Sequence, residues 1–501
     1  MRIPIVPLTV LAAAGAVPAA PLAPNTPAPI TLTARLATPL SSYSAKTGDL
    51  VDAVIASSVC LDGKALAPPV TLRGKVARVH AVGLGLVHET ASLKLALDGL
   101  ELSDGSVYPV EARLTAVDNA RERVDRNGVI HGIRATATLS SRFASHLVFA
   151  AQGHPALVIP TLAVESWLFR FPEPEIEYAA GTELEVEVTF PEELGRPALC
   201  SGREPGPAEA AEWKNLVAGL PTWSYSTGHE PIDPVNLLFI GSLSVLERAF
   251  QAAGWTGSQP KGLRTGFRAF RALAEERSFA EAPMRTLLLD GVPPDLRIQR
   301  TLNTFDKRDH MRIWLRGEEW RGWDIWAAAA TQDLAAVFTT HPPGVTHRIE
   351  ADIDLERDKV VRELEFTGCV DKVMNVERPP AQPETKAALE AKARRGLETD
   401  SRVAVILLNS CDHPNEEMGA SSQEQFASSA EPPTDVRVIR RVILTARNHF
   451  LRDNLFWRSA DVLRYGLHRF RTWEADKQQH RAARQALLAR RGEDPPGPKG
   501  R

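Results

Sequence analysis

The sequence predicts a multidomain protein: an N-terminal all-β barrel or sandwich, then an α+β (α/β) domain with a mixed sheet, then a helical basic tail. Three observations predict this organisation. Short alternating strands separated by Gly, Asp and Pro turns fill residues 30–190. Strands and amphipathic helices follow one another over residues 231–408. Between residues 437 and 491, fourteen Lys and Arg outnumber four Asp and Glu, so this end is basic although the chain has a formal net charge of −3.

The first residues have the pattern of a secretory signal peptide, which we place at residues 1–20. Arg2 supplies a positive charge, residues 3–17 are mainly apolar, and Val17-Pro18-Ala19 offers a small-residue cleavage site. The apolar run is shorter than the about 20 residues that span a bilayer, and an uncleaved anchor is the alternative. Residues 21–29 form a stiff Pro-rich linker. We therefore expect an exported protein, periplasmic or membrane-peripheral.

The β-domain is expected to contain strands at residues 30–36, 49–55, 70–79, 91–97 and 107–110. Residues 181–188 alternate cleanly and are expected to close the domain. Alternation places Leu184, Val186 and Val188 inward, and Glu183, Glu185 and Glu187 outward.

The strand order of this domain weakly resembles, in pattern only, the periplasmic β-barrel domain of conjugation-type secretion proteins. The segments that carry the resemblance are Gly48-Asp49-Leu50-Val51, Leu72-x-Gly74-x-Val76 and the Asp104-Gly105 turn. The resemblance implies a component of a secretion apparatus, which we keep as one possible function.

The rest of the chain divides at composition changes. Residues 191–230 are a linker with a short helix at about 208–220, and residues 409–435 are a flexible linker before the basic helical tail at 436–491. Residues 378–398 form an insertion, and residues 492–501 are disordered by composition. Within residues 231–408 we expect strands at 234–242, 284–290, 297–303, 310–315, 324–331, 370–376 and 402–408, and helices at 243–253, 262–277 and 355–366. A hairpin turn is expected at residues 317–319, and Ser244 to Glu247 fits a capping box.

The four cysteines, Cys60, Cys200, Cys369 and Cys411, are far apart in the sequence and form no C-x-x-C pair. They therefore indicate neither a disulfide framework nor a zinc finger. An oxidising compartment would allow two of them to pair, and the alternative is four small buried hydrophobic side chains.

Polar and titratable residues gather between apolar runs over residues 308–358. If residues 310–315 form a strand, His310 and Arg312 share a face with Trp314, while Met311, Ile313 and Leu315 face the core. Two imidazoles and a carboxylate suit a divalent metal that activates water for hydrolysis, and arginines can hold an anion bidentately. The candidates for ligand or anion binding are His310, Arg312, Asp333, His347, Asp354 and Arg357, and those for a metal are His310, Asp333 and His347.

A structural interpretation of the same residues is also open. The carboxylates of Asp352, Asp354 and Glu356 sit where they favour a helix N-terminus, and Arg357 is able to pair with Asp333 or Asp400.

Residues 231–408 resemble the LssY C-terminal domain family. The resemblance is carried by Asp233-Pro234-Val235-Asn236-Leu237, Ala252-Ala253-Gly254-Trp255, His310-x-Arg312-x-Trp314, Thr346-His347-x-Ile349-x-x-Asp352-x-Asp354-x-Glu356-Arg357-Asp358 and Thr399-Asp400-x-Arg402. The family commonly has two adjacent histidines where this chain has Asp309-His310, and glycine where it has Ser401. Relatives often lie beside membrane segments, whereas this chain has a β-domain there. The resemblance implies a domain but no established chemistry.

Arginines in the tail interleave with Phe, Leu and Trp, which is typical of a helix that lies on an anionic membrane surface. The partners we expect are such a surface, contacted by helices over Arg440 to Arg471, or other envelope proteins. The alternative is a helix packed on the domain with a solvated arginine face. We expect no nucleic-acid binding, because export separates the protein from that partner.

From these observations we expect an exported cell-envelope protein with a non-catalytic binding or assembly role. The alternative is a metal-dependent hydrolase that acts on an anionic phosphate or ester substrate of the envelope. A divalent metal is accordingly the one cofactor we consider.

Overall fold

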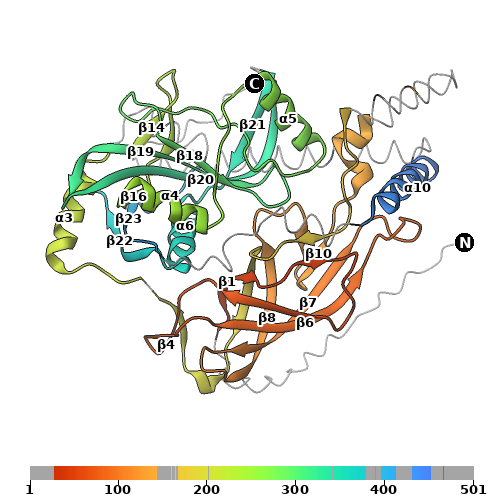
Figure 1. Ribbon diagram of the computed structural model, residues 1–501, viewed down its shortest axis with the longest axis horizontal. Helices are drawn as coiled ribbons and strands as arrows, with labels where there is room; N and C mark the ends of the chain where they lie inside the picture. The colour runs from red at the N-terminus through yellow and green to blue at the C-terminus, as the bar shows by residue number, and fades with distance from the viewer. Residues whose placement is uncertain are drawn as a thin grey trace, which may run out of the picture.

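The computed structural model describes residues 28–143, 168–200, 202–340, 343–379, 396–412 and 432–452, together with residues 160, 164, 390 and 467. Figure 1 shows a lower β-domain, an upper domain built around a long twisted sheet, and helix α10 (Thr434–Arg452) beside the first. The signal peptide and most of the insertion and linker at 378–435 lie outside the described residues, as does the tail after residue 452 apart from residue 467. In the described parts of the chain, no helix is long and apolar enough to cross a bilayer.

The first domain is a closed antiparallel barrel of six strands, in the order β6-β3-β1-β12-β8-β7 with β7 pairing back to β6. The sequence left a barrel or a sandwich open, and the β6–β7 pairing decides for the barrel. As predicted, the last strand closes it, because β12 pairs with both β1 and β8. The strands are β1 (Ile30–Leu36), β3 (Leu50–Ile55), β6 (Thr71–His80), β7 (Ser92–Glu101), β8 (Val107–Val117) and β12 (Glu183–Thr189).

Short strands extend this domain at its edges. β10 (Val129–His131) pairs with β7 and with β9 (Arg123–Val124). The other short strands form two small sheets: β2 (Leu40–Ser41) with β11 (Glu177–Tyr178), and β4 (Val59–Leu61) with β5 (Lys64–Ala65) and β13 (Pro197–Leu199).

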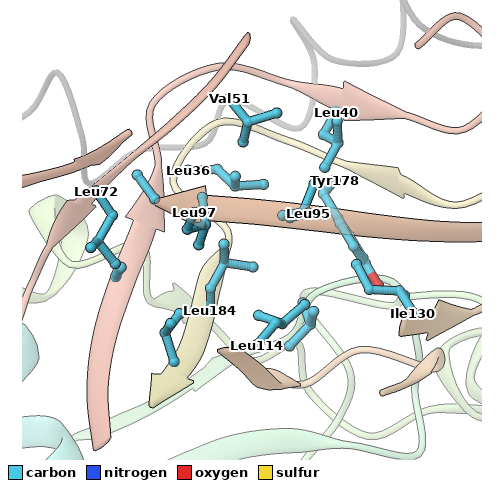
Figure 2. Packing of buried hydrophobic residues seen from close by; sticks show 14 of the residues in the cluster. Leu36, Leu40, Val51, Leu72, Leu95, Leu97, Leu114, Ile130, Tyr178 and Leu184 are labelled. Carbon is cyan, nitrogen blue, oxygen red and sulfur yellow. The ribbon is translucent and has the colours of Figure 1, made fainter. Parts of the chain in front are cut away.

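Aliphatic side chains from every barrel strand fill the interior, as Figure 2 shows around Leu72, Leu97 and Leu184. Burying one such side chain contributes roughly 1.5–3 kcal/mol. The predicted inward residues Leu184, Val186 and Val188 are fully buried. Gly74 is required where β6 pairs with β7, because a Cβ there would lie 2.1 Å from the carbonyl oxygen of Ala96.

The prediction that Glu183 faces outward is wrong. Glu183 is only 3% exposed and lies between Arg35 Nη2 at 2.6 Å and Arg300 Nη1 at 2.9 Å. Burial alone would raise the pKa of Glu183, but the charges of Arg300 and Arg35 lower it well below its usual range. The outward face of β12 is therefore covered by the second domain at this point, which alternation within one strand does not reveal.

The second domain is a mixed sheet in the order β17-β18-β19-β20-β16-β23-β22, with β21 pairing to β20. The β16–β23 pair is parallel and the other pairs are antiparallel, which confirms the predicted mixed sheet. Its strands are β16 (Leu237–Ile240), β17 (Thr256–Gly257), β18 (Leu296–Arg300), β19 (Arg308–Trp320), β20 (Trp323–Thr340), β21 (Pro343–Ile349), β22 (Val370–Glu377) and β23 (Arg402–Leu408). A separate hairpin joins β14 (Trp223–Tyr225) and β15 (Pro231–Pro234).

Both faces of this sheet are buried. Phe239 and Ile313 pack with α4 (Leu243–Ala252) and α6 (Asp354–Phe366) on one face, and Trp314 packs with α3 (Pro207–Ala218) on the other. Helix α5 (Leu263–Ala274) joins a smaller cluster with Phe305. Neighbouring residues of β19 are therefore both buried, so that its polar side chains are enclosed as well.

Four local predictions for this domain are wrong. Residues 284–290 form only the isolated bridges Tyr225–Leu288 and Leu289–Val292, in place of a strand. The β19–β20 hairpin turns at Arg321-Gly322, where both residues have positive φ, and its register shifts between Leu315 and Glu319. This shift leaves Leu315 47% exposed, although simple alternation placed it in the core. Helix α4 has Ser242 at its N-cap position, two residues before the predicted Ser244, and the Ser242 side chain makes no capping hydrogen bond.

All four cysteines are paired, as Cys60–Cys200 and Cys369–Cys411. The first disulfide joins β4 of the barrel domain to the segment after β13, and the second joins the residues before β22 and after β23. The sequence left the pairing open because partners 140 and 42 residues apart meet only in the folded chain.

A partly buried ion cluster joins the two domains, and we call Lys359, Asp118 and Asp309 the interdomain ion cluster. Lys359 of α6 lies 2.6 Å from Asp118 Oδ2, which follows β8 of the barrel, and also contacts Asp309 Oδ2 of β19. Asn119 donates to the same Asp309 oxygen at 2.7 Å. In Figure 1, α6 lies on the side of the second domain that faces the barrel. The cluster therefore fixes α6 and β19 against the barrel.

Helix α10 packs on the barrel through arginines that the sequence assigned to a membrane surface. Arg440 is 1% exposed and binds the Gly83 carbonyl together with Glu173 and Glu175. Arg447 donates to the carbonyls of residues 85, 86 and 87. Figure 1 shows α10 (blue) beside the barrel. These two arginines hold the helix in place, so the surface interpretation rests on the remaining ones.

Ser401 gives a first prediction. Its φ is +63°, in the left-handed region that disfavours residues with a Cβ. Ser401→Gly should raise the free energy of unfolding by about 0.5–1 kcal/mol, because relief of the Cβ clash exceeds the entropy cost of glycine. Urea unfolding measures this, with Ser401→Ala as the control that keeps the Cβ. A glycine variant no more stable than the alanine variant would contradict it.

Asp309 gives a second prediction, about pH. Burial raises its pKa to about 7, although Lys359 opposes the shift. A carboxyl whose pKa is raised in the folded state binds more protons there than when unfolded, so its contribution to stability is lost as pH rises from about 4 to about 7. The wild-type urea midpoint should therefore fall, relative to that of Asp309→Asn, across this range. The exposed Asp98→Asn is the control, and parallel curves for wild type and Asp309→Asn would refute the assignment.

Candidate functional site

The β19–β21 register brings three of the predicted site residues together. Asp333 pairs with Arg308 and Ile349, and His310 of β19 lies two residues from Arg308, while His347 of β21 lies two residues from Ile349. The Nδ1 atoms of His310 and His347 lie 3.7 Å and 3.5 Å from Asp333 Oδ2. We call these three residues the His–Asp cluster. The three metal candidates named from the sequence therefore converge on one carboxylate oxygen.

A residue that the sequence reasoning did not select holds this cluster. Arg308 Nε donates to the same Asp333 Oδ2 at 2.8 Å, and its Nη1 donates to Gln299 Oε1 at 3.1 Å. Phe305 packs against both side chains, with the Arg308 guanidinium over its ring and the His347 ring at its edge. Asp333 is thus the acceptor of a buried salt bridge.

Burial sets the protonation of the two histidines. It lowers the pKa of His310 to about 4 and also lowers that of His347, against the opposing charge of Asp333. Burial would raise the pKa of Asp333, but the positive charges of His310, Arg308 and His347 bring it below its usual value. Because His310 is neutral above about pH 4, Arg308 supplies the permanent positive charge. Neutral imidazoles beside a carboxylate are the protonation state that metal binding requires.

Both imidazole Nδ1 atoms are buried, and no group in the described residues hydrogen-bonds to them. His310 Nε2 shares a hydrogen bond of 2.9 Å with Thr331 Oγ1, which fixes its ring. The two nitrogens are available as ligands, whereas the carboxylate oxygen they face is already held by Arg308. Among the described residues, no three or more His, Cys, Asp or Glu side chains have the arrangement of a metal site. The donor types suit a divalent metal, but this arrangement admits one only if Arg308 withdraws.

Arg312 belongs to a second, separate ion pair. Its Nη1 donates to Asp233 Oδ2 at 2.8 Å and its Nε donates to the Arg285 carbonyl at 3.0 Å. Both Arg312 and Asp233 are 6% exposed. Burial lowers the pKa of Arg312, and Asp233 opposes this. Arg312 therefore neutralises a carboxylate of the same domain, in a position that joins β19 to β15.

Arg357 and Asp354 form a third group at the start of α6. The Arg357 nitrogens donate to Asp354, Asp358 and Asp400, and these hydrogen bonds raise the pKa of Arg357 even though burial alone would lower it. Asp354 in turn accepts from Thr399 Oγ1. Of the two partners considered for Arg357, the structure selects Asp400. The six predicted residues thus fall into three ion clusters, and the His–Asp cluster is the one that brings side chains of the three strands β19, β20 and β21 together at one carboxylate.

A polar cavity of about 340 Å³ lies beside these clusters, between the two domains. Asp118, Glu183 and Glu185 line it from the barrel, and Asp333, Glu356 and Lys359 line it from the second domain. We call it the interdomain cavity. A neighbouring cavity of about 230 Å³ shares Asp118 and Glu183 and reaches Arg300. The interdomain cavity connects the His–Asp cluster to the interdomain ion cluster, because it contains a member of each.

Sequence reasoning missed most of the residues at this interface. Asp118, Lys359 and Glu183 lie in ordinary surface patterns, and they become buried only because two distant segments meet. Glu356 was placed at a helix N-terminus, but its side chain is 2% exposed and lines the cavity. Arg308 was the one residue with a local signal, since it opens the strand that carries His310 and Arg312.

Comparison with known proteins supports the second domain and no other part of the chain. No curated protein matches the sequence. The family model described as LssY C-terminus matches residues 217–390, which overlaps the 231–408 expected from the motifs. The match includes the helix-to-sheet core from β14 to β22, and β23 adds to the same sheet beyond it. Residues 217–390, which cover most of the mixed-sheet domain, are therefore similar to the LssY C-terminus family.

Proposed function

We propose that this protein is exported to the cell envelope and acts there by binding, in a non-catalytic or assembly role. The observation that carries the proposal is the neutralisation of the polar block by its own side chains. Asp333 is bound by Arg308, Asp233 by Arg312, and Asp400 by Arg357. Groups that are engaged in this way build a rigid surface, whereas an anion clamp or a hydrolytic centre needs donors that are free to meet a substrate.

Export is supported by the cysteines together with the signal-like first residues. Two disulfides account for all four cysteines, and disulfides persist in oxidising compartments such as the periplasm. A periplasmic or membrane-peripheral location follows from this proposal. The barrel is consistent with the secretion-type resemblance, which we keep as the form that an assembly role would take.

The partners we propose are other envelope proteins or an anionic membrane surface near α10. Val438, Ile439 and Val442 of this helix are exposed, and so are Leu86 and Val87 of the barrel loop that Arg447 contacts. An apolar face of this kind beside basic residues suits either partner. Arg440 and Arg447 are engaged with the barrel, so they would hold the helix while other residues make the contact.

The second candidate function is a metal-dependent hydrolase for an anionic phosphate or ester substrate. It is favoured by one observation, the two unpartnered imidazole nitrogens that face Asp333. His310, His347 and Asp333 would hold the metal, which would supply an activated water. Arg308 would then have to release Asp333 and would be placed to bind the substrate anion.

Metal content together with a His347→Ala variant separates the two functions. For a binding protein we expect no stoichiometric Zn, Mn or Fe in the purified wild type. We also expect a melting temperature several degrees lower in His347→Ala. Loss of the His347 imidazole, which packs against Phe305 and Asp333, costs about 1–2 kcal/mol.

The control variant is His88→Ala, which removes a histidine of the barrel domain at a distance in sequence from the cluster. Stoichiometric metal that His347→Ala loses and His88→Ala retains would overturn the binding role in favour of the hydrolase.

A further inference from the structure

The interdomain cavity carries more negative than positive groups. Six carboxylates line it, and the cations on its walls are Lys307, Lys359 and Arg362. The six are Asp118, Glu183, Glu185, Asp333, Glu350 and Glu356. Lys359 is already shared between Asp118 and Asp309. Glu183 is paired with Arg35 and Arg300, and Asp333 with Arg308. Glu185, Glu350 and Glu356 then remain against Lys307 and Arg362, and this smaller excess of carboxylates in a partly closed space favours a positively charged occupant.

Glu356 is the independent sign that a ligand is missing. Its side chain is 2% exposed, it lines the cavity, and no described residue hydrogen-bonds to its Oε1 atom. A buried polar atom without a partner costs about 1–3 kcal/mol, so native proteins rarely leave one. Burial and the nearby Asp309 both favour the neutral carboxyl, and they raise the pKa of Glu356 well above its usual value.

The size of the cavity indicates what kind of cation fits. A volume of about 340 Å³ exceeds the roughly 30 Å³ of one water molecule several-fold, so the cavity has room for an organic molecule. Leu334 and Leu355 give its wall an apolar part, which suits a short alkyl chain. An ammonium group at the end of such a chain donates up to three hydrogen bonds, as a lysine does, and carboxylate oxygens accept them.

We propose that the interdomain cavity binds a small alkylammonium ligand whose charged nitrogen contacts Glu356. An alkylammonium ligand is a specific case of the binding role proposed above, and this inference rests on that role. Entry of the cation replaces the proton on Glu356, so that binding releases a proton to the solvent. The ligand touches both domains, and it therefore strengthens the connection that the ion pairs of Lys359 make between them.

The test is calorimetric titration of the full-length protein with 1,4-diaminobutane at pH 8. We expect saturable binding of one molecule per chain. Affinity should fall at least tenfold in Glu356→Gln, which keeps the shape and removes the charge, because a charge-assisted hydrogen bond is worth about 1.5–3 kcal/mol. At pH 5.5 the wild-type affinity should be several-fold lower, because binding releases a proton and a lower pH opposes that release.

Two further variants make the result specific. Glu318→Gln removes an equal charge from the exposed β19–β20 hairpin and should leave the affinity unchanged. Lys307→Ala removes a competing cation from the cavity wall and should tighten binding several-fold, and it remains informative if Glu356→Gln does not fold.

Three results would overturn the inference: no saturable binding by wild type, an equal loss in Glu318→Gln, or binding of Mg²⁺ or Ca²⁺ that excludes the diamine. Each of these results is read from binding of the diamine, whereas the His–Asp cluster, which shares Asp333 with the cavity wall, is tested separately by its metal content. Failure of the alkylammonium site is therefore distinguishable from failure of the binding role itself.

Discussion

The contact of Lys359 with Asp118 and Asp309 is the constraint on which the rest of this structure depends. One ammonium group joins a barrel loop, the start of β19 and helix α6, and of its two carboxylate partners Asp309 is fully buried and Asp118 partly buried. Removing a lysine from water costs several kcal/mol, and two carboxylates at hydrogen-bond distance are what offset this cost. Because the three groups come from distant parts of the chain, the position of the barrel on the mixed-sheet domain is fixed by them.

The same constraint explains why the interface is polar and hollow. Glu183, Arg300 and Glu363 continue the line of charges from the barrel into α6. Charged side chains need partners in defined directions, and they pack less closely than aliphatic ones. A cavity remains beside Glu356, between two domains whose own cores are tightly filled by Leu, Val and Ile. An enclosed polar space at a domain boundary is a common location for ligand sites.

The parts of the fold that depend on local patterns could be predicted. Alternation located β1 and β12, and helical spacing located α4 and α6, because each pattern reports which side of one element is buried. His310, Asp333 and His347 were grouped as metal candidates from their residue types, and it is the pairing of β20 with both β19 and β21 that brings them together. By contrast, Glu183 was assigned to solvent and Lys359 received no role. Their burial is a property of two surfaces in contact, and no periodicity within a single strand or helix records it.

The polar block of the mixed-sheet domain therefore performs two physical tasks at one place. Asp333 belongs both to the His–Asp cluster and to the lining of the interdomain cavity. A cation that enters the cavity would compete with Arg308 for the Asp333 carboxylate. The amount of positive charge near the neutral imidazoles would then change. The protonation of Glu356 and Asp309 and the environment of His310 and His347 are thereby linked through one carboxylate. In this arrangement, a ligand in the interdomain cavity would act on the same carboxylate that faces His310 and His347.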